Sequence, residues 1–355
     1  MEEKIQEQSV TTDLAALGEL LEDEIRKRDC SEEEKAEMLE KLRQFREAKT
    51  NIVLVGATGS GKSSTINALF SCGEPTADTV RLQEVAKVGI TPDPETSEIE
   101  KYTIGNLTLW DTPGLGDSAE QDLRSKDAIQ ELLEQTDDEG QPLIDLVLVV
   151  MDASSKDLGT TYNVLNDVII PAVEDTKRIL VALNQADIAM KHGRHWDYQV
   201  NSPDETLQTF LEDKVRSVKE RIMEDAGVEI DPIYYCAGCK DDEEVVVYPY
   251  NMAKLLYYIV GALPAEKRIP ILEGLNDDGE TFTHNDDKID YGSCVEESIF
   301  ETIGDMISEG VETGSEFGGV LLGVPGRLVG GVIGGAVGTV GGCIVGILNF
   351  LENLF

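Results

Sequence analysis

The sequence predicts an α/β fold in which a six-stranded, mostly parallel β-sheet is covered by helices on both faces. Short apolar runs have the length and composition of buried strands, and helical patterns lie between or after them. Such alternation is typical of parallel sheets. The second and third strands are separated by little more than Gly105, so they must form a tight hairpin with one antiparallel edge strand. Strands are expected at 51–56, 97–104, 106–111, 143–151, 178–184 and 231–236, and helices at 62–71, 119–136, 158–170, 204–226 and 249–262.

The chain of 355 residues is strongly acidic, with 30 basic and 69 acidic residues and a formal net charge of -39. A surface of this charge repels phosphate backbones, so free nucleic acid is not expected as a partner. The six cysteines follow no disulfide framework, and the N-terminus lacks the pattern of a secretory signal. Both features predict a cytoplasmic protein in a reducing compartment.

Changes of composition along the chain predict its domain organisation. An amphipathic pattern at the start predicts helices, the second of which opens with a capping box at Ser31 and Glu34. The polar stretch 264–300 is expected to be mainly a solvated linker. The predicted regions are N-terminal amphipathic helices over 1–49, the α/β domain over 50–263, an acidic linker and helical region over 264–316, and an apolar, glycine-rich segment over 317–355.

A phosphate-binding loop is predicted at the end of the first strand. Residues 56–63 read GATGSGKS, which matches G-x-x-x-x-G-K-[ST] in the required strand–loop–helix context. Its glycines let backbone N–H groups surround phosphate oxygens at the positive end of a helix. Lys62 is expected to span the β- and γ-phosphates, and Ser63 to offer its hydroxyl to Mg²⁺. The other expected contacts of the loop are Gly56, Thr58, Gly59, Ser60, Gly61 and Ser64.

A second motif, DTPG, occupies residues 111–114 directly after the apolar run NLTLWD. A carboxylate at this strand end is well placed to support a Mg²⁺ ion, so Asp111 is a predicted metal-site residue. The N–H of Gly114 is expected to meet the γ-phosphate and to sense its loss. A plain Pro-Gly turn would explain the glycine but not the aspartate.

Two further segments predict recognition of guanine. Residues 184–187 read NQAD at another strand end, where the Asp187 carboxylate can accept both the ring N–H and the exocyclic amine of guanine. Adenine would leave this carboxylate unpaired, which gives strong discrimination. Asn184 and Gln185 belong to the same predicted base site. After the last strand, Cys236-Ala237-Gly238 resembles the S-A-K/G loop of GTPases, whose alanine N–H meets the guanine carbonyl.

Residues 50–263 resemble the Era, septin and TrmE group of GTPases, and in particular bacterial YfjP- and YeeP-like proteins with an MMR-type G domain. The segments that carry the resemblance are NIVLVGATGSGKSSTINALF, ITPDP, LTLWDTPGLGD, LNQAD and YYCAG. The resemblance implies a Ras-like fold, GTP and GDP as ligands, and a Mg²⁺-dependent switch. It also places the catalytic and metal-binding switch threonine at Thr91, with Thr96 as the alternative.

Three departures change what the resemblance implies. Era-type proteins carry a basic RNA-binding domain after the GTPase unit, whereas the segment that follows here is acidic. Potassium-activated relatives have Asn at the position of Gly59. Leu115 stands where Ras-type proteins hold a water-positioning Gln. Intrinsic turnover is therefore expected to be slow, with activation by a partner or, as in septin-like relatives, by a homodimer through the GTPase face.

The C-terminal segment raises an alternative function. Residues 328–351 contain no charged side chain, and glycines recur every four residues from Gly326 to Gly346. A helix over this span would be about 36 Å long, slightly more than a hydrocarbon core of about 30 Å. Close helix packing through the glycines suits either a bilayer or a helical hairpin buried on the soluble domain. If the segment lies in a bilayer, the alternative function is a membrane-associated, GTP-controlled assembly protein. Such a protein would be peripheral or anchored at the inner face of the cell membrane through 317–355.

Overall fold

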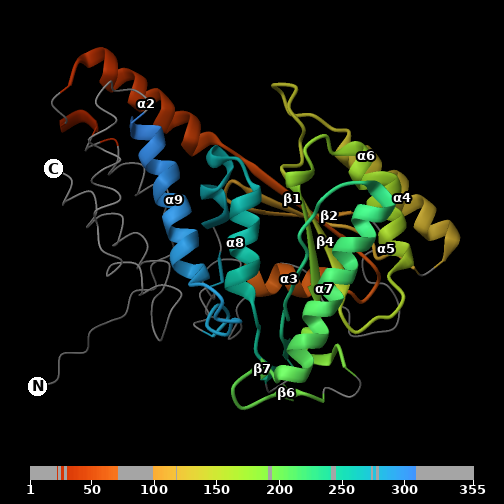
Figure 1. Cartoon of the computed structure of the whole chain (residues 1–355). Coiled ribbons are helices and arrows are strands. Elements are labelled where there is room, and N and C mark those ends of the chain that lie inside the picture. The colour runs from red at the N-terminus through yellow and green to blue at the C-terminus, as the bar shows by residue number, and fades with distance from the viewer. Residues whose placement is uncertain are drawn as a thin grey trace, which may run out of the picture.

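The computed structural model contains a six-stranded sheet with the strand order β2-β3-β1-β4-β5-β8 (Figure 1). The structure describes residues 22, 25–27, 30–70, 99–116, 118–190, 194–240, 245–272, 275–276 and 280–308. The strands are β1 (Thr50–Gly56), β2 (Glu100–Ile104), β3 (Leu107–Asp111), β4 (Leu146–Asp152), β5 (Ile179–Asn184) and β8 (Ile233–Tyr234). All pairs are parallel except the edge pair β2–β3. The predicted fold class is therefore confirmed, together with its antiparallel edge.

Each face of the sheet has its own apolar core. Along β1, Ile52 and Leu54 enter one core, whereas Val53 and Val55 enter the other. The same alternation continues in β4, where Leu148 joins the first core. Successive side chains of a strand point to opposite faces, so a strand buried on both sides needs a continuous apolar run. This requirement explains the apolar runs of the sequence.

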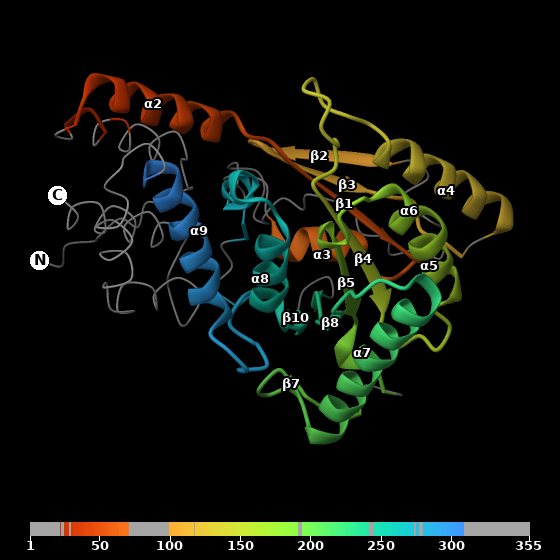
Figure 2. The same ribbon diagram turned by 45° about the horizontal axis from the view of Figure 1, so that its top comes forward.

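Helices cover both cores (Figure 2). The first core lies under α3 (Lys62–Leu69) and α8 (Met252–Ala262). The second lies under α4 (Ala119–Leu133), α5 (Gly159–Val164) with its continuations η1 (Leu165–Ile169) and α6 (Ile170–Ala172), and α7 (Glu205–Ala226). Ser118 accepts a hydrogen bond at the start of α4, and Asp204 accepts two at the start of α7, as preferred N-cap residues do.

Smaller elements connect the main ones. Two short antiparallel ribbons join β6 (Trp196–Asp197) to β7 (Ser202–Pro203) and β9 (Cys239–Lys240) to β10 (Val245–Val247). The 3-10 turns are η2 (Thr176–Arg178), η3 (Ala186–Ile188), η5 (Ala265–Lys267) and η6 (Ile269–Leu272). The ribbon β9–β10 lies between the last sheet strand and α8.

The predicted capping box opens α2 (Glu32–Glu47): the Ser31 N–H donates to Glu34, and the Glu34 N–H donates back to the Ser31 hydroxyl. Met38 and Leu42 bury this helix in the first core. The first of the two predicted N-terminal helices lies mainly outside the described residues. At the other end of the described chain, α9 (Tyr291–Ser308) packs along α8 and contacts α2 (Figure 1).

The expectation of a solvated linker over 264–300 is wrong for much of that stretch. Ile269, Ile271 and Leu272 enter the first core, and Val295 and Ile299 of α9 join them. Apolar residues are few here and stand between acidic runs, so composition concealed the packing. The apolar segment 317–355 lies outside the described residues. Among the helices that the structure does describe, none has the length and apolarity to cross a bilayer.

Candidate functional site

The motif residues of the described chain gather at the carboxyl ends of β1, β3, β5 and β8, which all run in the same direction. Gly56 ends β1, Asp111 ends β3 and Asn184 ends β5. Cys236 follows β8 within two residues. In open parallel sheets ligands bind outside these ends, so the predicted site residues share one edge. Thr91 and its alternative Thr96 lie outside the described residues.

The phosphate-binding loop needs glycine at specific positions. Gly59 and Gly61 have φ angles of 74° and 90°, which L side chains rarely adopt. A Cβ atom on Gly61 would also collide with the Asn184 amide, and one on Gly56 with a backbone carbonyl of β4. Gly61 is the N-cap of α3 and makes no side-chain cap, so the first turn of that helix presents backbone N–H groups to the loop.

Lys62 begins α3 and folds back over the loop. Its ammonium donates to the carbonyls of Gly56 and Ala57 at 3.2 and 3.3 Å. The residue is only 7% exposed. A buried cation at the mouth of a ring of N–H groups makes this loop a strong site for a polyphosphate.

Ser63 and Asp111 form the polar pair beside the loop. The Ser63 hydroxyl donates to Asp111 Oδ2 at 2.6 Å. Within the described residues, Oδ1 of the same carboxyl group is buried without a hydrogen-bond partner. Burial raises the pKa of Asp111, although the Ser63 hydroxyl and the nearby charge of Lys62 oppose that rise. A buried, incompletely satisfied carboxylate of this kind points to a further cationic or donor ligand.

This donor set fits magnesium bound to a phosphate. In the described part of the chain no cluster of three or more His, Cys, Asp or Glu side chains could hold a metal ion. Mg²⁺ does not need one, because it is often held by one or two carboxylates together with phosphate oxygens and water. A serine hydroxyl and one carboxylate are therefore a suitable protein contribution.

The DTPG turn packs directly on the phosphate-binding loop. The Thr58 N–H donates to the Leu115 carbonyl at 2.9 Å, and Leu115 donates to Gly56 at 3.3 Å. A Cβ atom on Gly114 would collide with the side chain and backbone of Thr58. The DTPG turn and the phosphate-binding loop therefore contact each other through their backbones. A movement of the DTPG turn must change the position of the phosphate-binding loop.

Asn184 and Gln185 tie the base-side loop to the phosphate-binding loop. The Asn184 amide donates to the Ser60 carbonyl at 3.0 Å. Gln185 donates to the Gly59 carbonyl at 2.6 Å, from a backbone with φ of 63°. The Gln185 side chain thus reaches the phosphate-binding loop.

Asp187 is buried at the end of this loop, 7% exposed. The Cys236 thiol donates to Asp187 Oδ1 at 3.1 Å. Burial raises the pKa of Cys236 well above its usual value, and the neighbouring carboxylate raises it further. The thiol therefore stays protonated and holds one oxygen of Asp187 in place, which explains the cysteine without a metal.

The Ala237 N–H, predicted to meet the guanine carbonyl, has a hydrogen-bond partner within the protein. It donates to Asn184 Oδ1 at 3.0 Å. The reason is that Asn184 lies between the phosphate-binding loop and the loop that contains Ala237. Its amide NH₂ donates to the first loop, and its amide oxygen accepts from the second. A guanine carbonyl would have to share or displace this hydrogen bond.

Sequence reasoning missed Tyr235, which lies beneath the phosphate-binding loop. Its hydroxyl and that of Thr65 are 2.6 Å apart, and Tyr235 is fully buried. Thr65 in turn donates to the Gly61 carbonyl at 2.7 Å. The signal was a tyrosine inside an apolar strand, since a buried hydroxyl requires a partner.

Comparison with known proteins gives a family match for part of the chain. Residues 51–185 match the family model described as 50S ribosome-binding GTPase. Interferon-gamma-inducible GTPase 10 of Mus musculus is 36% identical over 78 residues, which are 21% of this chain and only 17% of the mouse protein.

The structural similarities are weaker. Toc33 from Arabidopsis thaliana, solved with Mg²⁺ and GMPPNP, is 17% identical with a TM-score of 0.40, over 71% of this chain and 96% of Toc33. A probable GTP-binding protein engB is 19% identical with a TM-score of 0.32, over 60% of this chain and 98% of the other. The family match covers residues 51–185, the part of the chain that carries the phosphate-binding loop, the DTPG turn, Asn184 and Gln185.

Proposed function

We propose that this protein is a Mg²⁺-dependent molecular switch that binds GTP at the carboxyl edge of the sheet and hydrolyses it to GDP and phosphate. The observation that carries the proposal is the Ser63–Asp111 pair beside Lys62, with a carboxylate oxygen that has no partner among the described residues. Mg²⁺ bound by Ser63 and supported by Asp111 would neutralise charge on the β- and γ-phosphates. Thr91 is proposed to complete this metal site in the GTP state.

The protein's own groups are proposed to stabilise the charge that develops during hydrolysis. The loop N–H groups and Lys62 face the phosphates and oppose the negative charge on the transferred phosphoryl group. The Gly114 N–H is proposed to bind the γ-phosphate. Because the DTPG turn and the loop touch at Gly114 and Thr58, loss of the phosphate would release both together, which is the basis of the switch.

Specificity for guanine is proposed to rest on Asp187. Cys236 holds Oδ1 of this carboxylate, and the remaining acceptor positions suit the ring N–H and exocyclic amine of guanine. Asn184 and Gln185 keep the loop 184–187 at a fixed distance from the phosphate-binding loop. Adenine would leave the remaining acceptor positions of the buried Asp187 carboxylate unpaired, which costs binding free energy.

Turnover is expected to depend on a second molecule. Leu115 is 1% exposed and packs in the second core with Val55 and Ile129, so this position supplies no group to orient water. We expect phosphate release per molecule to rise at least about tenfold with protein concentration, because groups supplied in trans raise GTPase rates by about 10³–10⁵. The measurement is phosphate release at saturating GTP and Mg²⁺ over a dilution series.

Two controls accompany this assay. Chelation of Mg²⁺ with EDTA should stop hydrolysis at every concentration, and ATP should not replace GTP. A fast rate that does not change with concentration would contradict the proposed activation, because one chain would then hold the complete catalytic machinery. Undetectable GTP hydrolysis at high concentration would leave a requirement for a different activating partner.

The second candidate function is GTP-controlled assembly at a membrane, and the glycine ladder of 317–355 favours it. We expect full-length protein to sediment with liposomes of anionic and zwitterionic lipid, whereas a 1–316 truncation stays in the supernatant. Removal of the uncharged stretch 328–351 takes away the apolar area that a bilayer would bury.

The truncation also controls for the GTPase domain, since it keeps all the described residues. Its nucleotide affinity should equal that of the full-length protein. If both proteins stay soluble and monodisperse without detergent or liposome binding, the membrane function is wrong and the segment packs within the protein.

A further inference from the structure

The loop Cys236–Gly238, which we call the base loop, is supported by a part of the chain that carries no GTPase motif. Tyr250 pairs with Cys236 through two backbone hydrogen bonds. The Cys236 N–H donates to the Tyr250 carbonyl at 3.0 Å, and the Tyr250 N–H donates to the Cys236 carbonyl at 2.8 Å. The same loop contains the thiol that orients Asp187. The position of the Asp187 carboxylate therefore depends on the position of Tyr250.

Asn251 determines where Tyr250 lies. It is completely buried and has a φ angle of 59°, an uncommon conformation for a side chain other than glycine. Its amide donates to the Tyr234 carbonyl at 3.0 Å, at the end of β8. Its Oδ1 accepts from the Asp286 N–H at 2.9 Å, and its own N–H donates to the His284 carbonyl at 2.8 Å. One side chain thus joins the last sheet strand to a turn that follows α8 in the sequence.

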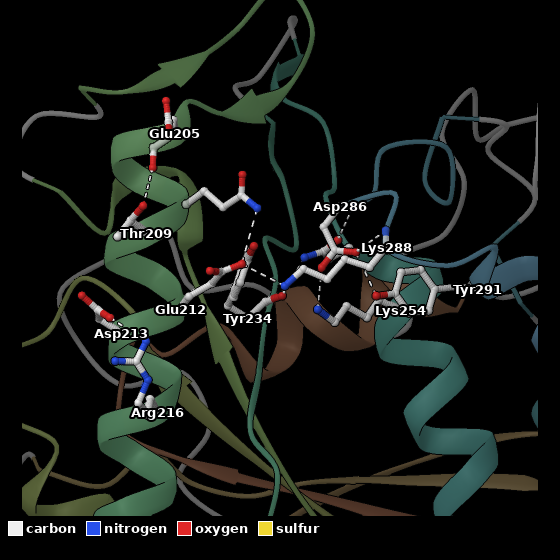
Figure 3. Close-up of polar contacts among 12 residues, drawn as sticks. Glu205, Thr209, Glu212, Asp213, Arg216, Tyr234, Lys254, Asp286, Lys288 and Tyr291 are labelled. Atoms are coloured by element: carbon white, nitrogen blue, oxygen red, sulfur yellow. Dashed lines mark hydrogen bonds and ion pairs between the residues drawn. The ribbon is translucent and has the colours of Figure 1, made fainter.

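A buried ion pair fixes that turn to α8. Lys254 donates to Asp286 Oδ2 at 2.6 Å, and the two side chains are only 9% and 1% exposed. The Tyr291 hydroxyl, at the start of α9, donates to Asp286 Oδ1 at 2.8 Å, and Figure 3 shows Lys254 and Tyr291 converging on Asp286. The Lys254 ammonium also lies 5.2 Å from the centre of the Tyr234 ring.

These contacts form a chain of well-satisfied buried groups. Burial alone would raise the pKa of Asp286, but the hydrogen bond and charge of Lys254, with help from Tyr291, hold it below its usual range. The carboxylate therefore remains charged and the pair remains closed. Buried ion pairs often add little net stability, but they specify a single arrangement strongly when every partner is satisfied.

We infer that Asn251, Asp286 and Lys254 are positioning residues for guanine recognition: they hold the base loop so that Cys236 and Asp187 meet the base. This inference rests on the proposed GTP-binding function. None of the three residues touches the nucleotide site; they act through Tyr250 and β8. Residues 280–291 are then a structural part of the base site, although they lie beyond the matched family region 51–185.

The main test is Asn251→Gly. Glycine accepts the positive φ angle without strain, so the backbone is kept while both side-chain hydrogen bonds are lost. We expect GTP binding to weaken about tenfold or more, because a small misplacement of recognition groups is costly. The preference for GTP over ITP should shrink by a similar factor, since ITP lacks the exocyclic amine. The value of kcat at saturating GTP should stay near that of the unmodified protein, because the phosphate-binding loop is unchanged.

A second variant tests the ion pair. Replacing both partners in Lys254→Met with Asp286→Leu removes the charges without leaving one buried alone. We expect a folded protein, judged by its thermal unfolding, with the same loss of GTP-over-ITP preference. Lys288→Gln is the matched control: Lys288 lies in the same turn and pairs with Glu212, but the two side chains are 49% and 41% exposed. Its nucleotide preference should not change.

The outcomes distinguish a failure of the proposed GTP-binding function from a failure of the positioning role. If the unmodified protein does not prefer GTP to ATP, the proposed function itself fails. If the unmodified protein is selective and folded Asn251→Gly or the double variant keeps the full preference for GTP over ITP, the positioning role is overturned. A lower unfolding temperature with unchanged selectivity would show a purely structural role and would overturn it as well.

Discussion

Lys62→Ala is expected to abolish tight binding of GTP and GDP. The ammonium is buried and already directed at the phosphate-binding loop by the carbonyls of Gly56 and Ala57. A hydrogen bond to a charged partner contributes roughly 1.5–3 kcal/mol, so affinity should fall about 10- to 150-fold. Titration with a fluorescent guanine nucleotide measures the change directly.

The matched control is Lys177→Ala. Lys177 is exposed and lies in η2, before the amino end of β5 and therefore at the opposite edge of the sheet. Both variants should unfold close to the temperature of the unmodified protein, because neither removes apolar core. Unchanged nucleotide affinity in folded Lys62→Ala would show that the loop does not hold the phosphates.

Asp187→Asn is expected to change the preferred base from guanine to xanthine. The Cys236 thiol donates to Oδ1 of Asp187, so an asparagine at 187 should place its oxygen there and direct its NH₂ group at the base. Guanine presents donors at that edge and would meet a donor, whereas xanthine presents a carbonyl in place of the exocyclic amine. GTP affinity should fall about 10²-fold or more, and XTP should become the better ligand.

Competition of GTP, XTP and ATP against one labelled nucleotide measures this change. Asp138→Asn removes a carboxylate from an exposed turn and should leave the order of affinities as it is. If Asp187→Asn still binds GTP better than XTP, the carboxylate does not read the base and its assignment is wrong.

The fold and the position of the site were largely predictable because their signals are local. A strand buried on both faces requires a continuous apolar run, and β1, β4 and β5 have one each. The phosphate-binding loop requires glycine at φ angles closed to other residues, so Gly59 and Gly61 identify it in the sequence. Strand ends then place Asp111 and Asn184 without further information.

The support of the base loop was not predictable because its contacts are distant in sequence and carry no motif. Asn251 meets Asp286 across 35 residues, and Lys254 meets it across 32. One signal was present. Lys254 stands alone in the apolar helix MAKLLYYIVGA, and a lysine buried in such a helix requires a carboxylate partner. The sequence does not say which of the many carboxylates that partner is.

The ion pair between Lys254 and Asp286 also has a consequence for the order of events during synthesis. A nascent chain that has reached residue 263 already contains every nucleotide-site motif, but the turn with His284 and Asp286 that contacts Asn251 has not yet been synthesised. At about 5–20 residues per second, the ribosome needs on the order of 2–10 s to add residues 239–286 after the base loop. Under the inference above, full selectivity for guanine is expected only after Asp286 has been added and meets Lys254.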